Sequence, residues 1–119
     1  MKDNNIKKLT FQFAVKIISL YKKLVNEKKE YVISKQILRS GTSIGANYRE
    51  ADNAVSKADF VHKLSISQKE ADETLYWLEL LMETKYIDKE HYNELHTEGE
   101  TILKIIKTII INTKKNMKK

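Results

Sequence analysis

The chain contains no cysteine, no proline and only three glycines among its 119 residues. Without cysteine it has no disulfide framework, no thiolate zinc site and no cysteine nucleophile. Proline and glycine mark most turns, so their scarcity predicts a few long helices with few turns between them. The apolar run Ile109–Ile111 near the C-terminus is too short to cross a membrane. No apolar run follows the N-terminal lysines as a signal peptide would require. We therefore expect a cytoplasmic protein with no membrane partner.

Catalytic and metal-binding motifs are also missing. There are three histidines, and the nearest two, His91 and His96, would lie about 140° apart around a helix, too far to chelate one metal. The sequence has no nucleophile elbow, zinc-protease motif or phosphate-binding glycine loop. Glu70 and Glu73 share a helix face as paired carboxylates, but Glu73 stands where a di-iron bundle has the His of its Glu-x-x-His pair, and no second pair exists. We expect no enzymatic activity, no cofactor and no metal site.

Apolar periodicity predicts four helices within a single domain spanning residues 1–119, over residues 9–28, 32–54, 57–84 and 89–113. Ser56 and Asp88 are the expected N-caps of the third and fourth helices. The connections are short, which forces consecutive helices to run antiparallel. The predicted fold is therefore an all-α, antiparallel up-down-up-down four-helix bundle. Its basic tail, residues 112–119, is expected to fray.

The second helix carries an unusual polar stripe in place of the Lys- and Glu-rich face of an ordinary surface helix. Its members recur at steps of three and four residues: Gln36, Arg39, Ser43, Asn47 and Glu50.

Antiparallel pairing about Ser56 predicts that facing residues of the second and third helices have numbers that add to about 112. Arg39 should then form an ion pair with Glu73, and Ser43 a hydrogen bond with Glu70. Small residues at Ser40, Gly41, Ser43 and Gly45 should let these two helices approach closely. We interpret this polar network as structural, because such groups fix helix register and partner choice.

Lysine is concentrated in the first helix and at the C-terminus, and the formal net charge is +6. Such a surface either attracts phosphates or simply solvates the helices. With only two arginines, a nucleic-acid complex would depend on backbone contacts and shape more than on base readout. The candidate nucleic-acid-binding residues are Lys7, Lys8, Lys16, Lys22, Lys23, Lys114, Lys115, Lys118 and Lys119.

Two helices carry more apolar residues than one bundle interior needs, which predicts contacts between subunits. The surplus residues are Phe11, Ile18 and Leu20 in the first helix, and Leu103, Ile105 and Ile110 in the fourth.

Three consecutive segments resemble the bacterial four-helix bundle proteins encoded within intervening sequences of large-subunit ribosomal RNA genes. These segments are QILRSGTSIGANYREA at 36–51, SKADFVHKL at 56–64 and KEADETLYWLELL at 69–81. The resemblance implies a bundle that assembles as a ring-shaped homopentamer, without established enzymatic activity. It also implies kinship with the accessory protein of diversity-generating retroelements, whose partners are a reverse transcriptase and RNA.

We therefore expect a non-enzymatic oligomeric bundle whose basic surface binds nucleic acid, RNA in particular. The alternative is a protein-interaction scaffold or accessory subunit, partnering a polymerase or another protein, that makes no direct contact with nucleic acid.

Overall fold

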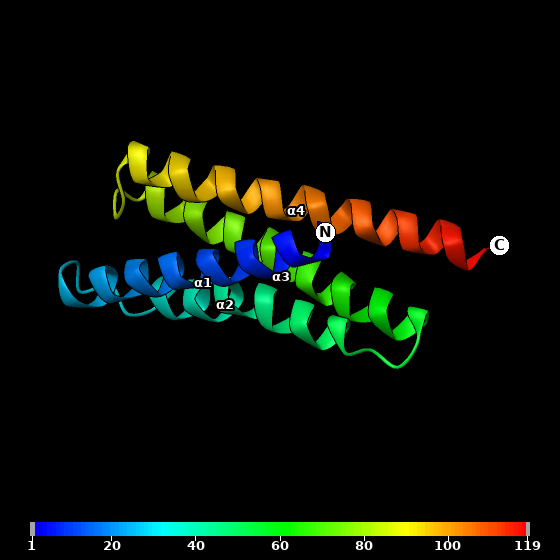
Figure 1. Ribbon diagram of the computed structural model, residues 1–119. Coiled ribbons are helices and arrows are strands. Elements are labelled where there is room, and N and C mark those ends of the chain that lie inside the picture. The colour runs from blue at the N-terminus through cyan, green and yellow to red at the C-terminus, as the bar shows by residue number, and fades with distance from the viewer. Residues whose placement is uncertain (1, 119) are drawn as a thin grey trace.

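Four helices account for almost all of residues 2–118, the part of the chain described by the computed structural model (Figure 1). They are α1 (Lys2–Asn26), α2 (Ile33–Asp52), α3 (Lys57–Glu83) and α4 (Lys89–Met117). No strand occurs within residues 2–118, and the molecule measures 52 × 22 × 21 Å. The prediction of an all-α protein with four helices is confirmed.

Each helix packs against two others, in the cyclic order α1–α2–α3–α4, while the Cα atoms of the diagonal pairs do not come within 8 Å of each other in the described residues. Pairs across α2 and α3 run in opposite senses along the chain, since Arg39 meets Glu73 and Glu50 meets Lys63. Figure 1 shows the chain reversing direction at each of the three connections. The C-terminal half of α4 and the start of α3 therefore lie toward the same end of the molecule.

The buried apolar residues of all four helices form one cluster. In α1 the buried stripe begins at Ile6 and continues through Phe13, Ile17 and Leu24. Ile6 is fully buried, and α1 begins at Lys2 instead of the predicted residue 9. Burying Ile6 adds apolar area to the core, which favours extending the helix toward the N-terminus.

Three of the residues predicted to be surplus for subunit contacts are buried within the chain. They are Leu20, Leu103 and Ile110. That prediction was wrong for them because α1 and α4 each touch two neighbouring helices, which widens the arc that a helix buries. Phe11 and Ile18 remain exposed, together with Val15, while Ile105 is half-buried.

The predicted end of the fourth helix at residue 113 was also wrong, because α4 continues through residue 117, into the tail that was expected to fray. No glycine or proline interrupts residues 112–117. Lys114 and Lys115 lie in the last turn, where positive charge interacts favourably with the helix dipole. The outermost residue, Lys119, lies outside the described part of the chain.

Two glycines of α2 face α1 and not α3, contrary to expectation. A β-carbon built on Gly41 would lie 2.8 Å from Cγ2 of Ile17, and one on Gly45 would lie 3.1 Å from Oγ1 of Thr10. A side chain at Gly41 would require Ile17 to shift, and one at Gly45 would be tightly packed against Thr10, so both glycines favour the close approach of α2 to α1. The close approach expected between α2 and α3 also occurs, because Ser40 bonds to Thr74 and Ser67 bonds to the backbone carbonyl of Ile44.

The predicted N-caps of α3 and α4 are confirmed. The Ser56 hydroxyl accepts a hydrogen bond from the Asp59 amide at 3.0 Å, and the Asp88 carboxylate accepts one from the His91 amide at 2.8 Å. Each cap satisfies an amide that has no partner within its own helix.

The start of α2 is capped by Glu30, a residue that the sequence pattern assigned to a plain linker. Its carboxylate accepts hydrogen bonds from the backbone amides of Val32, Ile33 and Ser34 at 3.1, 3.0 and 2.6 Å. Burial favours the neutral acid, but the three backbone bonds outweigh this effect and lower the pKa of Glu30 below its ordinary value. Glu30 thereby joins the α1–α2 connection to the first turn of α2.

We predict that Glu30→Gln destabilises the protein by about 1–2 kcal/mol at neutral pH, the range for loss of a helix cap. A carboxyl whose pKa falls on folding stabilises the folded state above its unfolded pKa, and this stabilisation is lost as pH falls through the folded pKa. The difference in stability between the two proteins should therefore begin to shrink below the ordinary pKa of about 4.3 and vanish once the pH is below the lowered pKa of folded Glu30. Chemical denaturation at several pH values measures the difference, with the exposed Glu27→Gln as control. A constant difference down to pH 2 would contradict this role of Glu30.

Candidate functional site

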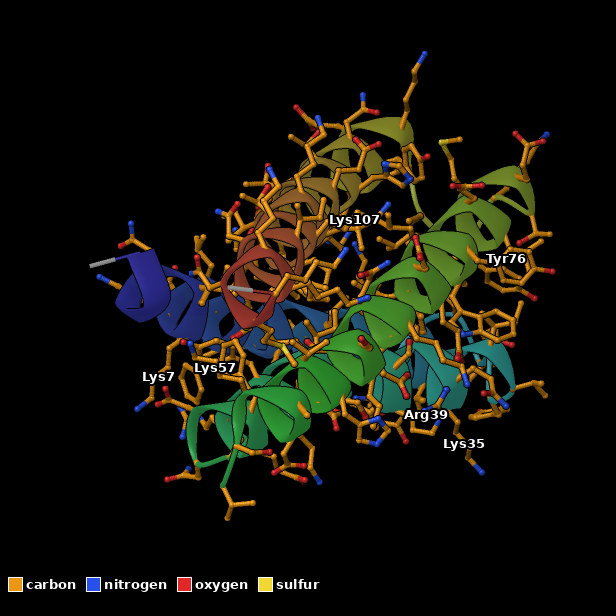
Figure 2. All side chains as sticks on the ribbon, turned by 90° about the vertical axis from the view of Figure 1, so that its right-hand side faces the viewer. Lys7, Lys35, Arg39, Lys57, Tyr76 and Lys107 are labelled. Carbon is orange, nitrogen blue, oxygen red and sulfur yellow. The ribbon has the colours of Figure 1, made fainter. Side chains whose placement is uncertain are left out.

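A polar cluster on the outer groove between α2 and α3 is centred on Arg39. One guanidinium nitrogen of Arg39 bonds to Glu73, and another lies 3.1 Å from Oε1 of Glu70. The side chain of Arg39 is 50% exposed, against 14% for Glu70 and 28% for Glu73. The predicted Arg39–Glu73 pair is confirmed, and Glu70 completes a fork of two carboxylates around one cation. Figure 2 labels Arg39.

Glu73 is held from a second side by Trp77. The Trp77 indole donates a hydrogen bond of 3.1 Å to the same carboxylate oxygen that receives Arg39. Burial favours the neutral acid, but the bonds from Trp77 and Arg39 outweigh it and lower the pKa of Glu73 below its ordinary value. Glu73 is therefore an ionised structural partner, poorly suited to act as a general acid or base near neutral pH.

The other members of the polar stripe bond mainly within α2. The Ser43 hydroxyl donates to the Arg39 carbonyl at 2.6 Å, and the Asn47 amide donates to the Ser43 carbonyl at 2.8 Å. The predicted Ser43–Glu70 hydrogen bond was wrong, because the single hydroxyl proton is already used and an ionised carboxylate only accepts. Gln36 is exposed, and Glu50 pairs with Lys63 of α3 at 3.1 Å.

Two buried hydroxyls supply the deeper polar contacts between these helices. The Thr74 hydroxyl donates to the Glu70 carbonyl at 2.8 Å and bonds to the Ser40 hydroxyl at 2.8 Å, and Ser67 donates to the Ile44 carbonyl at 2.8 Å. The small size of Ser40 was a signal for this contact, whereas nothing in the sequence pattern singled out Ser67. Buried bonds of this kind are expensive to leave unmade, so they fix the register of α2 on α3.

This cluster has no arrangement suited to catalysis. Both carboxylates face one arginine, and residues 5–118 contain no group of three or more His, Asp or Glu side chains that could hold a metal ion. The geometry supports the structural interpretation of the stripe.

The structure separates the candidate nucleic-acid-binding lysines. Lys16 bonds to Glu98 at 2.5 Å and to Glu94 at 3.1 Å, and these contacts raise the pKa of Lys16 above its ordinary value. Lys16 is thus occupied by α4 and is not free to contact a phosphate. Lys22 and Lys23 lie near the opposite end of α1 from Lys7 and Lys8. Lys119 lies outside the described residues.

The remaining candidates gather on the half of the molecule that carries the C-terminus of α4. The starts of α1 and α3 lie toward this half (Figure 1). We define the basic end as the exposed lysines Lys7, Lys8, Lys57, Lys104, Lys107, Lys114, Lys115 and Lys118. None of them forms an ion pair within the described residues. Figure 2 faces this end and labels Lys7, Lys57 and Lys107 on three different helices.

Three lysines of the basic end were not among the sequence candidates: Lys57, Lys104 and Lys107. A signal for two of them was available, because Lys104, Lys107, Lys114 and Lys118 recur at helical spacing and share a face of α4. The sequence contains no acidic residue after Glu100. Lys57 belongs to the basic end because the tertiary arrangement places the start of α3 at the same end of the molecule as the C-terminal part of α4.

An open groove of about 360 Å³ lies beside this lysine stripe. It runs between Asn5 of α1 and α4, where Lys104, Ile105, Thr108, Ile109 and Asn112 form its wall. The half-buried Ile105 and Ile109 give it an apolar floor.

Among the described residues, the four helices are too polar to include a segment that could span a membrane.

The exposed, unpaired lysines of the basic end can contact phosphate groups that approach this surface from solvent.

For the polar cluster we predict a coupling energy of about 1 kcal/mol between Arg39 and Glu73, typical of a partly solvated pair and below the 3–5 kcal/mol of a fully buried one. Thermal or urea unfolding of Arg39→Ala, Glu73→Ala and the double variant measures this coupling. Lys63→Ala with Glu50→Ala is the matched exposed pair on the same two helices and should show a smaller coupling. Additive effects at Arg39 and Glu73 would contradict the fork.

The sequence model of the 23S rRNA-intervening sequence protein family matches residues 2–108, and no curated protein matches the chain. A crystal structure described as a protein with unknown function from the S23 ribosomal protein family, from Bacteroides thetaiotaomicron VPI-5482, is 58% identical, with a TM-score of 0.91. The match covers 92% of this chain and 98% of that one. The chain belongs to the family of 23S rRNA-intervening sequence proteins.

Proposed function

We propose that this protein is a non-enzymatic RNA-binding protein that contacts phosphates through the basic end. The observation that carries the proposal is the gathering of eight exposed lysines from three helices, none paired with an acid in the described residues. Lys16 and Arg39 are instead paired with acids. Other exposed lysines, such as Lys22 and Lys35, also lack an acidic partner within the described residues, so the gathering of lysines distinguishes the basic end and not the lack of partners alone. The family name refers to a ribosomal RNA, which supports RNA over DNA as the first ligand to test.

The expected mode of binding is electrostatic. Lysine presents a point charge and lacks the planar fork with which arginine reads guanine, so phosphate contacts should dominate over base contacts. Lys114, Lys115 and Lys118 lie beyond residue 108, where the match to the family ends, while Lys7, Lys8, Lys57, Lys104 and Lys107 lie within it. The three tail lysines would therefore enlarge a basic surface whose other five lysines lie within the residues that match the family.

We further propose that the up-down-up-down bundle assembles into a ring-shaped homo-oligomer, a pentamer in the first instance, acting in the cytoplasm. The exposed side chains of Phe11, Val15 and Ile18 recur at helical spacing along α1 and are 56%, 49% and 38% accessible. Burying such a stripe against another copy would remove its apolar area from water. Assembly would also bring several basic ends into one particle and strengthen RNA binding through multivalency.

A scaffold that binds a polymerase or another protein is the alternative function. The exposed Tyr76, which packs edge-on against Trp77 with ring centroids 5.0 Å apart, favours it. Tyrosine, tryptophan and arginine are enriched in protein interfaces. Arg39 lies close to this aromatic pair, because Arg39 and Trp77 bond to the same carboxylate of Glu73. This alternative requires that the basic end make no direct contact with nucleic acid.

The RNA-binding proposal predicts a uniform loss of affinity when one stripe of α4 is neutralised. Lys107→Gln/Lys114→Gln/Lys118→Gln should weaken binding of unrelated RNA sequences alike. The slope of the logarithm of the binding constant against the logarithm of the salt concentration should become less steep by up to about 2, or roughly 0.7 for each phosphate that is no longer neutralised. Fluorescence anisotropy over a range of salt concentrations measures both effects.

The control is Lys22→Gln/Lys35→Gln/Lys69→Gln, which removes the same charge from exposed positions outside the basic end. Its salt dependence should stay close to that of the natural protein. Equal weakening in both variants would mean that net charge, and not the basic end, determines binding. If the natural protein retains no RNA at low salt, the scaffold replaces RNA binding as the proposed function.

The assembly proposal predicts a mass of about five times the 13.9 kDa chain by light scattering at micromolar concentration. Val15→Lys should reduce this mass because it places charge in the apolar stripe, while circular dichroism should show unchanged helix content. Gln12→Lys, at an exposed neighbouring position of α1, is the control for added charge. A monomeric natural protein would refute assembly, and an unchanged mass for Val15→Lys would exclude this stripe as the interface.

A further inference from the structure

A second lysine-rich feature lies at the opposite end of the molecule from the basic end. There the last turns of α1 approach the α3–α4 connection (Figure 1). A hollow of about 540 Å³ opens between them, within the range of about 300–1,000 Å³ typical of small-molecule sites. Four lysines from three parts of the chain line it: Lys23, Lys28, Lys85 and Lys89.

These four cations are not neutralised by neighbours. None forms an ion pair within the described residues, although Glu83 and Asp88 also line the hollow. The Asp88 carboxylate is already engaged, because it accepts the His91 amide at 2.8 Å as the cap of α4. Lysines outnumber carboxylates two to one, so the hollow carries an excess of positive charge.

Lys85 occupies a backbone conformation that favours glycine. Its φ is 66°, and the chain around it closes α3 with hydrogen bonds from Tyr86 to Leu81 at 2.8 Å and from Lys85 to Met82 at 3.0 Å. Glycine is the usual residue at this helix-ending position. A lysine there is strained relative to glycine. Lys29, after the end of α1, has a similar φ of 55° without lining the hollow, so the conformation places the Lys85 side chain and is not itself a sign of ligand binding.

The hollow also offers apolar surface. Met82, Tyr86 and Ile87 line it alongside the lysines, with Ile87 buried and the other two half-buried. A ligand that combines a dianionic group with a flat or apolar part would find a complement for both, since lysines attract the charge and the Tyr86 ring and its neighbours contact the remainder.

We propose that this hollow binds the phosphate monoester of a nucleotide, with Lys23, Lys85 and Lys89 around the phosphate and Tyr86 beside the base or sugar. A phosphate monoester carries up to two negative charges and three acceptor oxygens, which suits a hollow lined by several lysines better than the single charge of an internal phosphodiester does. The site is separate from the basic end and does not depend on the proposed RNA binding. Its nucleotide is either free or the phosphorylated terminus of a nucleic acid.

Calorimetric titration with adenosine monophosphate tests the proposal directly. The natural protein should bind it with a Kd of about 1 mM or tighter, and adenosine, which lacks the phosphate, at least about tenfold more weakly. Lys85→Gly/Lys89→Gln should weaken binding by at least about tenfold. Glycine relieves the strained backbone, so loss of folding is not expected from this change. Lys114→Gln/Lys115→Gln, which alters only the basic end, should bind adenosine monophosphate as the natural protein does.

Matched oligonucleotides distinguish the two sources of the phosphate. A preference for a 5′-phosphorylated strand over its 5′-hydroxyl counterpart, abolished in Lys85→Gly/Lys89→Gln, assigns the site to a nucleic-acid terminus. Binding of the mononucleotide with no such preference assigns it to a free nucleotide. Three results would overturn the proposal: no binding of millimolar adenosine monophosphate, equal binding of adenosine, or unchanged affinity in the lysine variant. None of these results bears on the RNA affinity of the basic end, which other lysines carry.

Discussion

The close approach of α2 to α1 is the constraint on which the rest of the structure depends. Gly41 and Gly45 place the backbone of α2 directly against Ile17 and Thr10, leaving no room for a β-carbon at Gly41. This contact fixes the rotation of α2 about its own axis. Because helix faces are spaced by fixed angles, the same rotation directs Ser40 toward Thr74 and Arg39 toward Glu70 and Glu73.

The polar contacts of α2 then act on partner choice more than on overall stability. An apolar interface alone would tolerate sliding of α2 along α3, whereas the buried Ser40–Thr74 and Ser67–Ile44 bonds are satisfied in one register only. The Glu30 cap anchors the beginning of α2, and the Arg39 fork holds its middle. The polar stripe is explained by this structural role, which leaves the functional surfaces to be sought elsewhere on the molecule.

Charge is arranged along the length of the bundle. In the middle, Lys16 is paired with acids of α4 and Arg39 with acids of α3. Toward both ends exposed lysines lack such partners within the described residues, with the larger group at the end where α4 terminates. Unpaired lysines add little to folding stability, and their mutual repulsion opposes it. Their grouping at two ends therefore favours a role in contacting anions.

The sequence by itself determined the number and type of the helices, the caps at Ser56 and Asp88, and the Arg39–Glu73 pair, since periodicity, capping and short connections are local signals. It also identified five lysines of the basic end. Only the tertiary structure decided which apolar residues are covered, that Gly41 and Gly45 serve the α1 contact, and that Glu30 caps α2. Tertiary packing likewise removed Lys16 from the candidates by pairing it with α4, and brought Lys57 to the lysines of α4. The physical reason is that a helix pattern gives the angle of each side chain around its own axis, while burial and pairing depend on which neighbouring helix occupies that direction.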